Sequence, residues 1–218
     1  MDIANLLSLT LFFVSLFISV RAFYLYIQAR SRRIFILALS MGMIALTAVA
    51  GYAGDNVTSI SLNVDWFNYI GQTVSFIFIL LSFFRNSDEY LRSLMRWHIV
   101  VSLLLLVLLF LAPVLPPEFP APAVTKSILS GSRGFICFVI FFYYVYVFMR
   151  KETRFSLLMG IAFLLLCLGY SIIIPKYVTP NDALDQNGDL IRIAGLLVLF
   201  LAVLLPERSQ QSYAETGA

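Results

Sequence analysis

Seven apolar stretches, each long enough to cross a bilayer, fill most of this 218-residue chain. A helix that spans the hydrocarbon core of a membrane needs about 20 mostly apolar residues. The stretches are continuous and do not alternate with a period of two residues, so they predict helices and not the strands of a membrane barrel. The seven predicted spans cover residues 3–27, 34–53, 66–84, 97–115, 127–149, 155–174 and 190–205.

The composition excludes a water-soluble protein. Only 12% of the residues are charged, against about 25% in soluble domains. We therefore expect an all-α protein with one domain, a seven-helix transmembrane bundle over residues 1–205, and a short disordered tail over residues 206–218. The first stretch has no basic segment before it and no small-residue cleavage site after it, so we expect it to be a retained helix and not a signal peptide.

The basic residues predict the orientation of the chain in the membrane. Of the fifteen lysines and arginines, ten lie in alternate connections between spans and in the tail: Arg30, Arg32, Arg33, Arg85, Arg92, Arg96, Arg150, Lys151, Arg154 and Arg208. The other connections hold only Lys126 and Lys176. Because basic loops stay in the cytoplasm, we expect the N-terminus outside and the C-terminus inside, in a multi-pass protein of the cell inner membrane.

Polar side chains at membrane depth are costly, which makes them candidates for function. In the third span, Asp65, Asn68, Gln72, Ser75 and Ser82 are separated by three, four, three and seven residues. This spacing places them on one face of a helix. We expect that face to point into the bundle, because lipid cannot satisfy a side-chain amide.

Two arginines are predicted near the same outer end, Arg133 in the fifth span and Arg192 in the seventh, with Tyr170 in the sixth. Asp189 precedes Arg192 by three residues, which is an ion-pair spacing on a helix. One interpretation is an outer-half cavity that binds a small anionic ligand, since a guanidinium matches a carboxylate or a phosphate. The other is structural: Asp65 and Asp189 neutralise the two arginines, while Asn68 and Gln72 join helices.

The sequence predicts no catalytic, metal-binding or cofactor-binding residues. The only histidine, His98, stands beside Trp97 at the predicted start of the fourth span, where we expect it to anchor the helix at the membrane interface. A lone histidine does not build a metal site. No activated nucleophile or acid–base pair is recognisable, so we do not expect an enzyme. The basic residues lie in loops and do not form a nucleic-acid-binding surface.

Seven helices with an outside N-terminus resemble the arrangement of microbial rhodopsins. That family requires a lysine in the seventh helix, which this chain lacks, so the resemblance does not extend to covalently bound retinal. In length, topology and the residues Asp189, Arg192 and Gly195, the whole chain also resembles the seven-transmembrane sensory modules of bacteria that precede histidine kinase or cyclic-nucleotide output domains. This resemblance implies a sensory function but no particular residue roles.

Three functions therefore stay open at the level of the sequence. The first is a receptor or sensor-like module that binds a small polar or anionic ligand, or a lipid headgroup, through Asp65, Asn68, Gln72, Arg133, Tyr170, Asp189 and Arg192. It would sit in the lipid bilayer and signal through a partner protein or as a homo-oligomer. The second is an accessory or structural subunit of a larger membrane complex. The third is a small transporter or channel, which the apolar inner half of the third span disfavours.

Overall fold

The computed structural model describes residues 3–56, 64–85, 87–114, 122–177 and 182–204. In these segments the chain forms seven α-helices and two short 3₁₀-helices, η1 (Ala112–Val114) and η2 (Ile174–Tyr177). The α-helices are α1 (Ile3–Ala29), α2 (Arg32–Asn56), α3 (Asp65–Phe84), α4 (Asp88–Leu111), α5 (Ala123–Lys151), α6 (Arg154–Ile173) and α7 (Asp182–Leu204). Each is long and apolar enough to cross a membrane, which confirms the predicted all-α, seven-helix fold. The tail predicted to be disordered lies outside the described residues.

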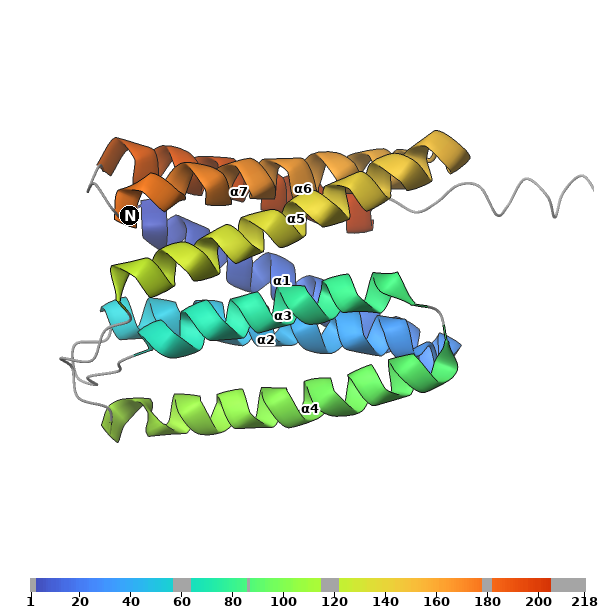
Figure 1. The fold of residues 1–218 in the computed structure, drawn as a ribbon, viewed down its shortest axis with the longest axis horizontal. Helices are drawn as coiled ribbons and strands as arrows, with labels where there is room; N and C mark the ends of the chain where they lie inside the picture. Colours follow the sequence, from blue (N-terminus) through green and yellow to red (C-terminus); the bar gives the residue numbers. More distant parts are fainter. Residues whose placement is uncertain (1–2, 57–63, 86, 115–121, 178–181, 205–218) are drawn as a thin grey trace, which may run out of the picture.

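Six of these helices form a closed ring, and α4 lies outside it. Each helix contacts the next one around the ring, in the order α1, α2, α3, α5, α6 and α7, and α7 contacts α1. Among the described residues, α4 packs only on α2 and α3 and on its own extension η1, so it is a peripheral helix (Figure 1). The largest apolar core lies inside the ring and draws on all six of its helices.

The two ends of the bundle differ in charge. The connections α1–α2, α3–α4 and α5–α6 lie at one end, on the right of Figure 1, which we call the basic end because it carries Arg30, Arg32, Arg33, Arg85, Arg150 and Lys151. The start of α1 lies at the other end, together with the helix ends that precede and follow residues 57–63, 115–121 and 178–181; we call this the opposite end. Successive connections alternate between the two ends because each helix runs in the opposite direction to the one before it.

Helix α4 begins at Asp88, nine residues before the start that its apolar run predicted. The prediction was wrong because a local signal starts the helix outside the apolar run. The Ser87 hydroxyl caps it by accepting a hydrogen bond from the Tyr90 amide at 3.3 Å, and Asp88 and Glu89 complement the helix dipole in the first turn. The helix therefore extends further toward the basic end than its apolar run.

Helix α7 also begins earlier than predicted, at Asp182 instead of residue 190. Residues 182–189, which precede the expected span, add about two helical turns to α7. Hydropathy marks only where a helix could lie in lipid, and a polar sequence does not by itself end a helix. The extension carries Asp185 and Asp189 alongside the end of α6.

His98 does not anchor α4 at the membrane interface, as we had expected, but lies in the interior with 1% of its surface exposed. Its ring stacks on Phe78 of α3, with 4.1 Å between the centroids, and its Nε2 lies 3.5 Å from the Ser40 hydroxyl of α2. The early start of α4 explains the difference, because it moves His98 from the first turn of the helix to the third. His98 is therefore one of the side chains that attach α4 to the ring.

Helices α6 and α7 approach each other through glycines. A Cβ atom added to Gly169 of α6 would lie 2.9 Å from the carbonyl oxygen of Gly188 and 3.1 Å from the amide nitrogen of Arg192, both on α7. Small residues at helix interfaces are typical of membrane bundles, where close backbone approach replaces the hydrophobic effect as a source of stability. The contact also places the first part of the Arg192 side chain against Gly169.

We expect Gly169→Ala to destabilise the bundle, because the new methyl group would meet backbone atoms that cannot rotate away. Overpacking of this kind costs about 1–3 kcal/mol. Gly131→Ala on α5 is the matched control, since its nearest neighbour is the end of the Ile174 side chain at 3.5 Å. Thermal unfolding of the two purified variants in detergent measures the difference; equal melting temperatures would contradict the close α6–α7 contact.

Candidate functional site

Arg133 is a buried cation whose hydrogen bonds go to neutral groups. It lies in the third turn of α5 with 4% of its surface exposed. One guanidinium nitrogen donates to the Gln72 side-chain carbonyl on α3, and its Nε donates to the backbone carbonyl of Leu129 at 3.3 Å. Gln72 is held in turn by its own amide, which donates to the Asn68 side-chain oxygen at 2.6 Å.

Two tyrosine rings complete the surroundings of Arg133. Its guanidinium carbon lies 5.3 Å from the ring centroid of Tyr69 and 4.8 Å from that of Tyr170. Aromatic faces attract a cation through their quadrupole and stabilise it away from water without removing its charge. We call the set Tyr69, Gln72, Arg133, Tyr170 and Arg192 the arginine–tyrosine site.

Arg192 shares Tyr170 with Arg133. Its guanidinium carbon lies 5.2 Å from the Tyr170 centroid, and it forms an ion pair with Asp189, one turn earlier on α7. The Asp189 and Arg192 side chains are 6% and 16% exposed. The buried Nε of Arg192 has no hydrogen-bond partner among the described residues. A buried donor without a partner is costly, so this nitrogen is a position where an acceptor would be stabilised.

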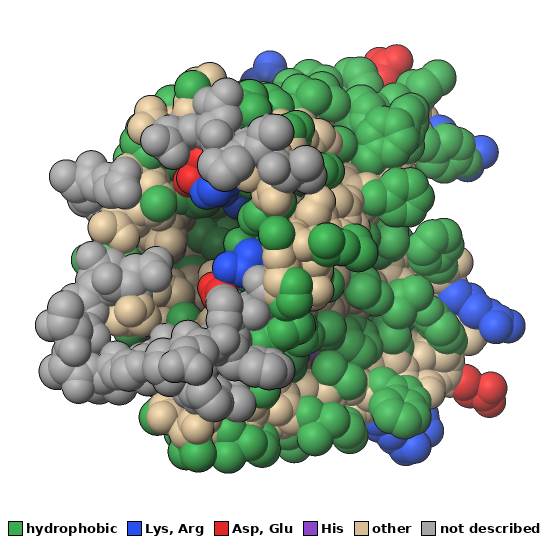
Figure 2. All heavy atoms as spheres, turned by 60° about the vertical axis from the view of Figure 1, so that its left-hand side comes forward, with side chains coloured by type: hydrophobic (Ala, Val, Ile, Leu, Met, Phe, Trp, Pro, Cys, Tyr) green, Lys and Arg blue, Asp and Glu red, His purple; other side chains and the backbone are tan. Residues whose placement is uncertain are grey.

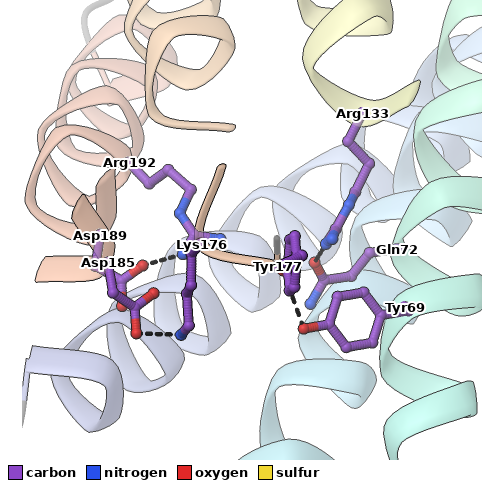
Figure 3. Close-up of polar contacts among 8 residues, drawn as sticks. All are labelled: Tyr69, Gln72, Arg133, Lys176, Tyr177, Asp185, Asp189 and Arg192. Carbon is purple, nitrogen blue, oxygen red and sulfur yellow. Dashed lines mark hydrogen bonds and ion pairs between the residues drawn. The ribbon is translucent and has the colours of Figure 1, made fainter. Parts of the chain in front are cut away.

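Two further ion pairs lie at the margin of the site. Lys126 of α5 pairs with Asp65 of α3 at 2.7 Å, and Lys176 of η2 pairs with Asp185 of α7. The hydroxyl groups of Tyr69 and Tyr177 lie 3.2 Å apart and join α3 to η2. Figure 3 shows the Lys176–Asp185 pair beside Arg192 and Asp189, with Arg133 and Gln72 on the other side of Tyr177.

The charges that the structure describes at the opposite end do not balance. Among the side chains described at the opposite end, the cations are Lys126, Arg133, Lys176 and Arg192, and the carboxylates are Asp65, Asp185 and Asp189. Each carboxylate has a partner other than Arg133. The surplus positive charge therefore belongs to Arg133, the most deeply buried of the four cations.

The opposite end of the bundle is hollowed. Figure 2 brings this end forward and shows a recess with hydrophobic side chains in its floor and basic and acidic side chains beside it. A positive group set back from the surface and surrounded by low-dielectric side chains interacts more strongly with an anion than the same group in water.

The structure brings most of the predicted site residues together. The third-span face points inward as predicted, with Gln72, Ser75 and Ser82 at most 6% exposed. Asn68, Gln72, Arg133 and Tyr170 form one connected set, and Asp189 and Arg192 form the predicted ion pair beside it. Asp65 lies at the margin, and the prediction that it neutralises Arg133 was wrong because Lys126 is its partner.

One residue of the site, Tyr69, was missed, and so were four residues at its margin: Lys126, Lys176, Tyr177 and Asp185. Tyr69 could have been found, because it stands four residues after Asp65 and three before Gln72 and so shares their helical face. The other four had been assigned to connections, where a sequence does not reveal which helix end a side chain meets.

The arginine–tyrosine site holds two guanidinium groups, which can donate hydrogen bonds to an anion. No cluster of three or more His, Cys, Asp or Glu side chains lies in the described segments. The seven apolar helices define the chain as a multi-pass α-helical membrane protein. No family model, curated protein or solved structure matches it, so any narrower class must be argued from the site itself.

Proposed function

We propose that this chain is a receptor or sensor-like binding module, without enzymatic activity, that takes a small anionic ligand or an anionic lipid headgroup at the arginine–tyrosine site. The observation that carries the proposal is Arg133, a buried cation with no carboxylate partner among the described residues. A carboxylate or phosphate on the ligand would compensate its charge and accept from the guanidinium fork. The unpartnered Nε of Arg192 offers a second donor.

The proposal includes an orientation. The basic end would face the cytoplasm of a cell inner membrane and the arginine–tyrosine site would open outside, because basic connections stay inside. A signal would then pass to a partner protein at the basic end. We prefer a binding module to a channel because the inside of the ring becomes apolar beyond the site: Phe76, Ile79 and Leu166 take over from Gln72 and Tyr170. A polar solute would have no polar path to follow.

Anion binding is tested by thermal unfolding of the purified protein with inorganic phosphate or with succinate. A ligand at 100 times its Kd stabilises the folded state by about 2.7 kcal/mol. We expect one of the two anions to raise the melting temperature of the wild type and to have no effect on Arg133→Gln. That variant removes the charge but can still hydrogen-bond to the Gln72 carbonyl.

Arg150→Gln is the control variant, because it removes an arginine at the basic end that stacks on Tyr146 and leaves the site intact. It should respond to the anion as the wild type does. Equal stabilisation of the wild type and Arg133→Gln would contradict the proposal and leave the arginine–tyrosine site as a structural connection between α3, α5 and α6.

A further inference from the structure

A second space lies inside the ring, in the half of the bundle nearer the basic end. It is a cavity of about 200 Å³ lined by all six ring helices and by no residue of α4. One lining residue from each helix, in chain order, is Ile18, Met41, Ile79, Tyr144, Phe163 and Leu199. Because the lining comes from the whole ring, the cavity is an interior feature and not a groove on the lipid-facing surface.

The chemistry of the lining favours a hydrocarbon. Beyond the apolar residues, only Ser15, Arg33, Ser82 and Tyr144 bring polar side-chain atoms. A buried water needs two to four polar partners, whereas an apolar cavity of about 150 Å³ is known to stay dry and to bind benzene. With about 30 Å³ for a group the size of water, the space accommodates roughly seven such groups, which corresponds to part of one acyl chain and not two.

Arg33 connects this cavity to a polar recess at the basic end. The recess has a volume of about 250 Å³ and is lined by Arg30, Ser31, Arg32, Arg33, Asp88 and Leu91. Arg33 lines both spaces, so they are neighbours on either side of this residue. The recess is formed where α1 turns into α2, at Arg30 with a positive φ of 52°, against the first turn of α4.

The recess has an excess of positive charge. It contains three arginines and one carboxylate, and that carboxylate, Asp88, pairs with Arg32 at 2.7 Å. Arg33 donates from its Nε to the Ser82 carbonyl at 2.9 Å and from a terminal nitrogen to the Arg85 carbonyl at 3.5 Å. These two acceptors hold the guanidinium at the end of α3.

We propose that the cavity and the recess together form a binding site for a single-chain anionic amphiphile. The hydrocarbon chain occupies the cavity among Met41, Phe163 and Leu199, and the carboxylate or phosphate head lies in the recess against Arg33 and Arg30. This site lies at the other end of the bundle from the arginine–tyrosine site and does not depend on the function proposed for it.

The site is mapped first on the unmodified protein in phosphatidylcholine nanodiscs, with decanoate that carries a photoreactive diazirine near its chain end. We expect labelling of residues inside the ring, in the segments that contain Met41, Phe163 and Leu199, and we expect unlabelled decanoate to suppress it. Labels confined to lipid-facing residues such as Leu103 and Phe110 of α4, and not suppressed by competitor, would overturn the proposal. This mapping needs no variant to fold.

Variants then separate the chain site from the head site, with bound ligand counted by native mass spectrometry. Leu199→Trp fills the cavity and should weaken binding of decanoate and of decyl phosphate at least tenfold. Leu103→Trp is the control, because it makes the same change on a side chain of α4 that is 57% exposed. If Leu199→Trp does not fold, Met41→Phe makes a smaller change in the same space.

Arg33→Gln should weaken binding of both anions at least tenfold and leave binding of uncharged decanol unchanged, while Arg150→Gln should change none of the three. A preference for decanoate would indicate a fatty acid as the natural source, and a preference for decyl phosphate a phosphorylated lipid. Equal binding of decanol and the two anions by the wild type would contradict the role assigned to the recess.

Discussion

Replacing Asp189 by asparagine is expected to lower the free energy of unfolding by about 3–5 kcal/mol, the range found when one partner of a buried ion pair is removed. Asp189 and Arg192 form such a pair, with side chains 6% and 16% exposed. Asparagine preserves the shape of the carboxylate but leaves the Arg192 charge uncompensated in a site from which water is largely excluded. The loss is measured by unfolding the purified protein in mixed micelles of increasing dodecyl sulfate content.

The chain provides a matched control one helical turn away. Asp185 pairs with Lys176, but these side chains are 30% and 38% exposed. Water screens such a pair, so Asp185→Asn should cost at most about 1 kcal/mol. Equal losses for Asp185→Asn and Asp189→Asn would show that burial does not govern the Asp189–Arg192 pair.

The double variant Asp189→Asn/Arg192→Gln tests the cause of the loss. If the uncompensated charge of Arg192 is responsible, its removal should recover most of the stability, because a buried pair replaced as a whole costs far less than a broken one. A double variant as unstable as Asp189→Asn alone would indicate that the carboxylate has another essential partner.

The helices of this protein could be predicted from the sequence because lipid imposes a local rule. Each span is decided within a window of about 20 residues by the cost of placing polar groups in hydrocarbon, and each of the seven α-helices of the described residues covers most of one expected span. The inward face of α3 follows from the same cost, since Gln72 and Ser75 cannot be satisfied by lipid. Helix ends were predicted less well, because Ser87 caps α4 where hydropathy gives no signal.

The arrangement of the helices could not be predicted in this way. Which helices become neighbours depends on shape complementarity between residues far apart in the chain, such as Gly169 and Gly188. The same holds for the choice of ion-pair partner: Asp65 and Lys126 meet because α3 and α5 are adjacent in the ring. The cavity inside the ring has no sequence signal at all, because its lining residues are those of any apolar helix face.

Replacing Gln72 by leucine is the second change for which we expect a large effect, a loss of about 1.5–3 kcal/mol, as found for hydrogen bonds to charged groups. Leucine has a similar volume, so the packing of α3 is largely retained while the buried guanidinium of Arg133 loses its side-chain acceptor. Thr73→Val is the control on the next residue, because the Thr73 hydroxyl bonds to neutral carbonyls of Tyr69 at 2.8 Å and Leu129 at 3.4 Å. It should cost about 1 kcal/mol or less.

The response of the Gln72→Leu variant to an anion also distinguishes the two interpretations of the arginine–tyrosine site. If Arg133 binds an anion, phosphate or succinate should stabilise Gln72→Leu at least as much as the wild type, because the ligand then supplies the only strong acceptor for the guanidinium. If Arg133 only connects helices, the anion should leave Gln72→Leu unchanged, and Arg133→Met in the same background should recover the lost stability. One unfolding measurement therefore distinguishes the two interpretations. Both depend on the unneutralised charge of Arg133, which lies among Tyr69, Gln72 and Tyr170.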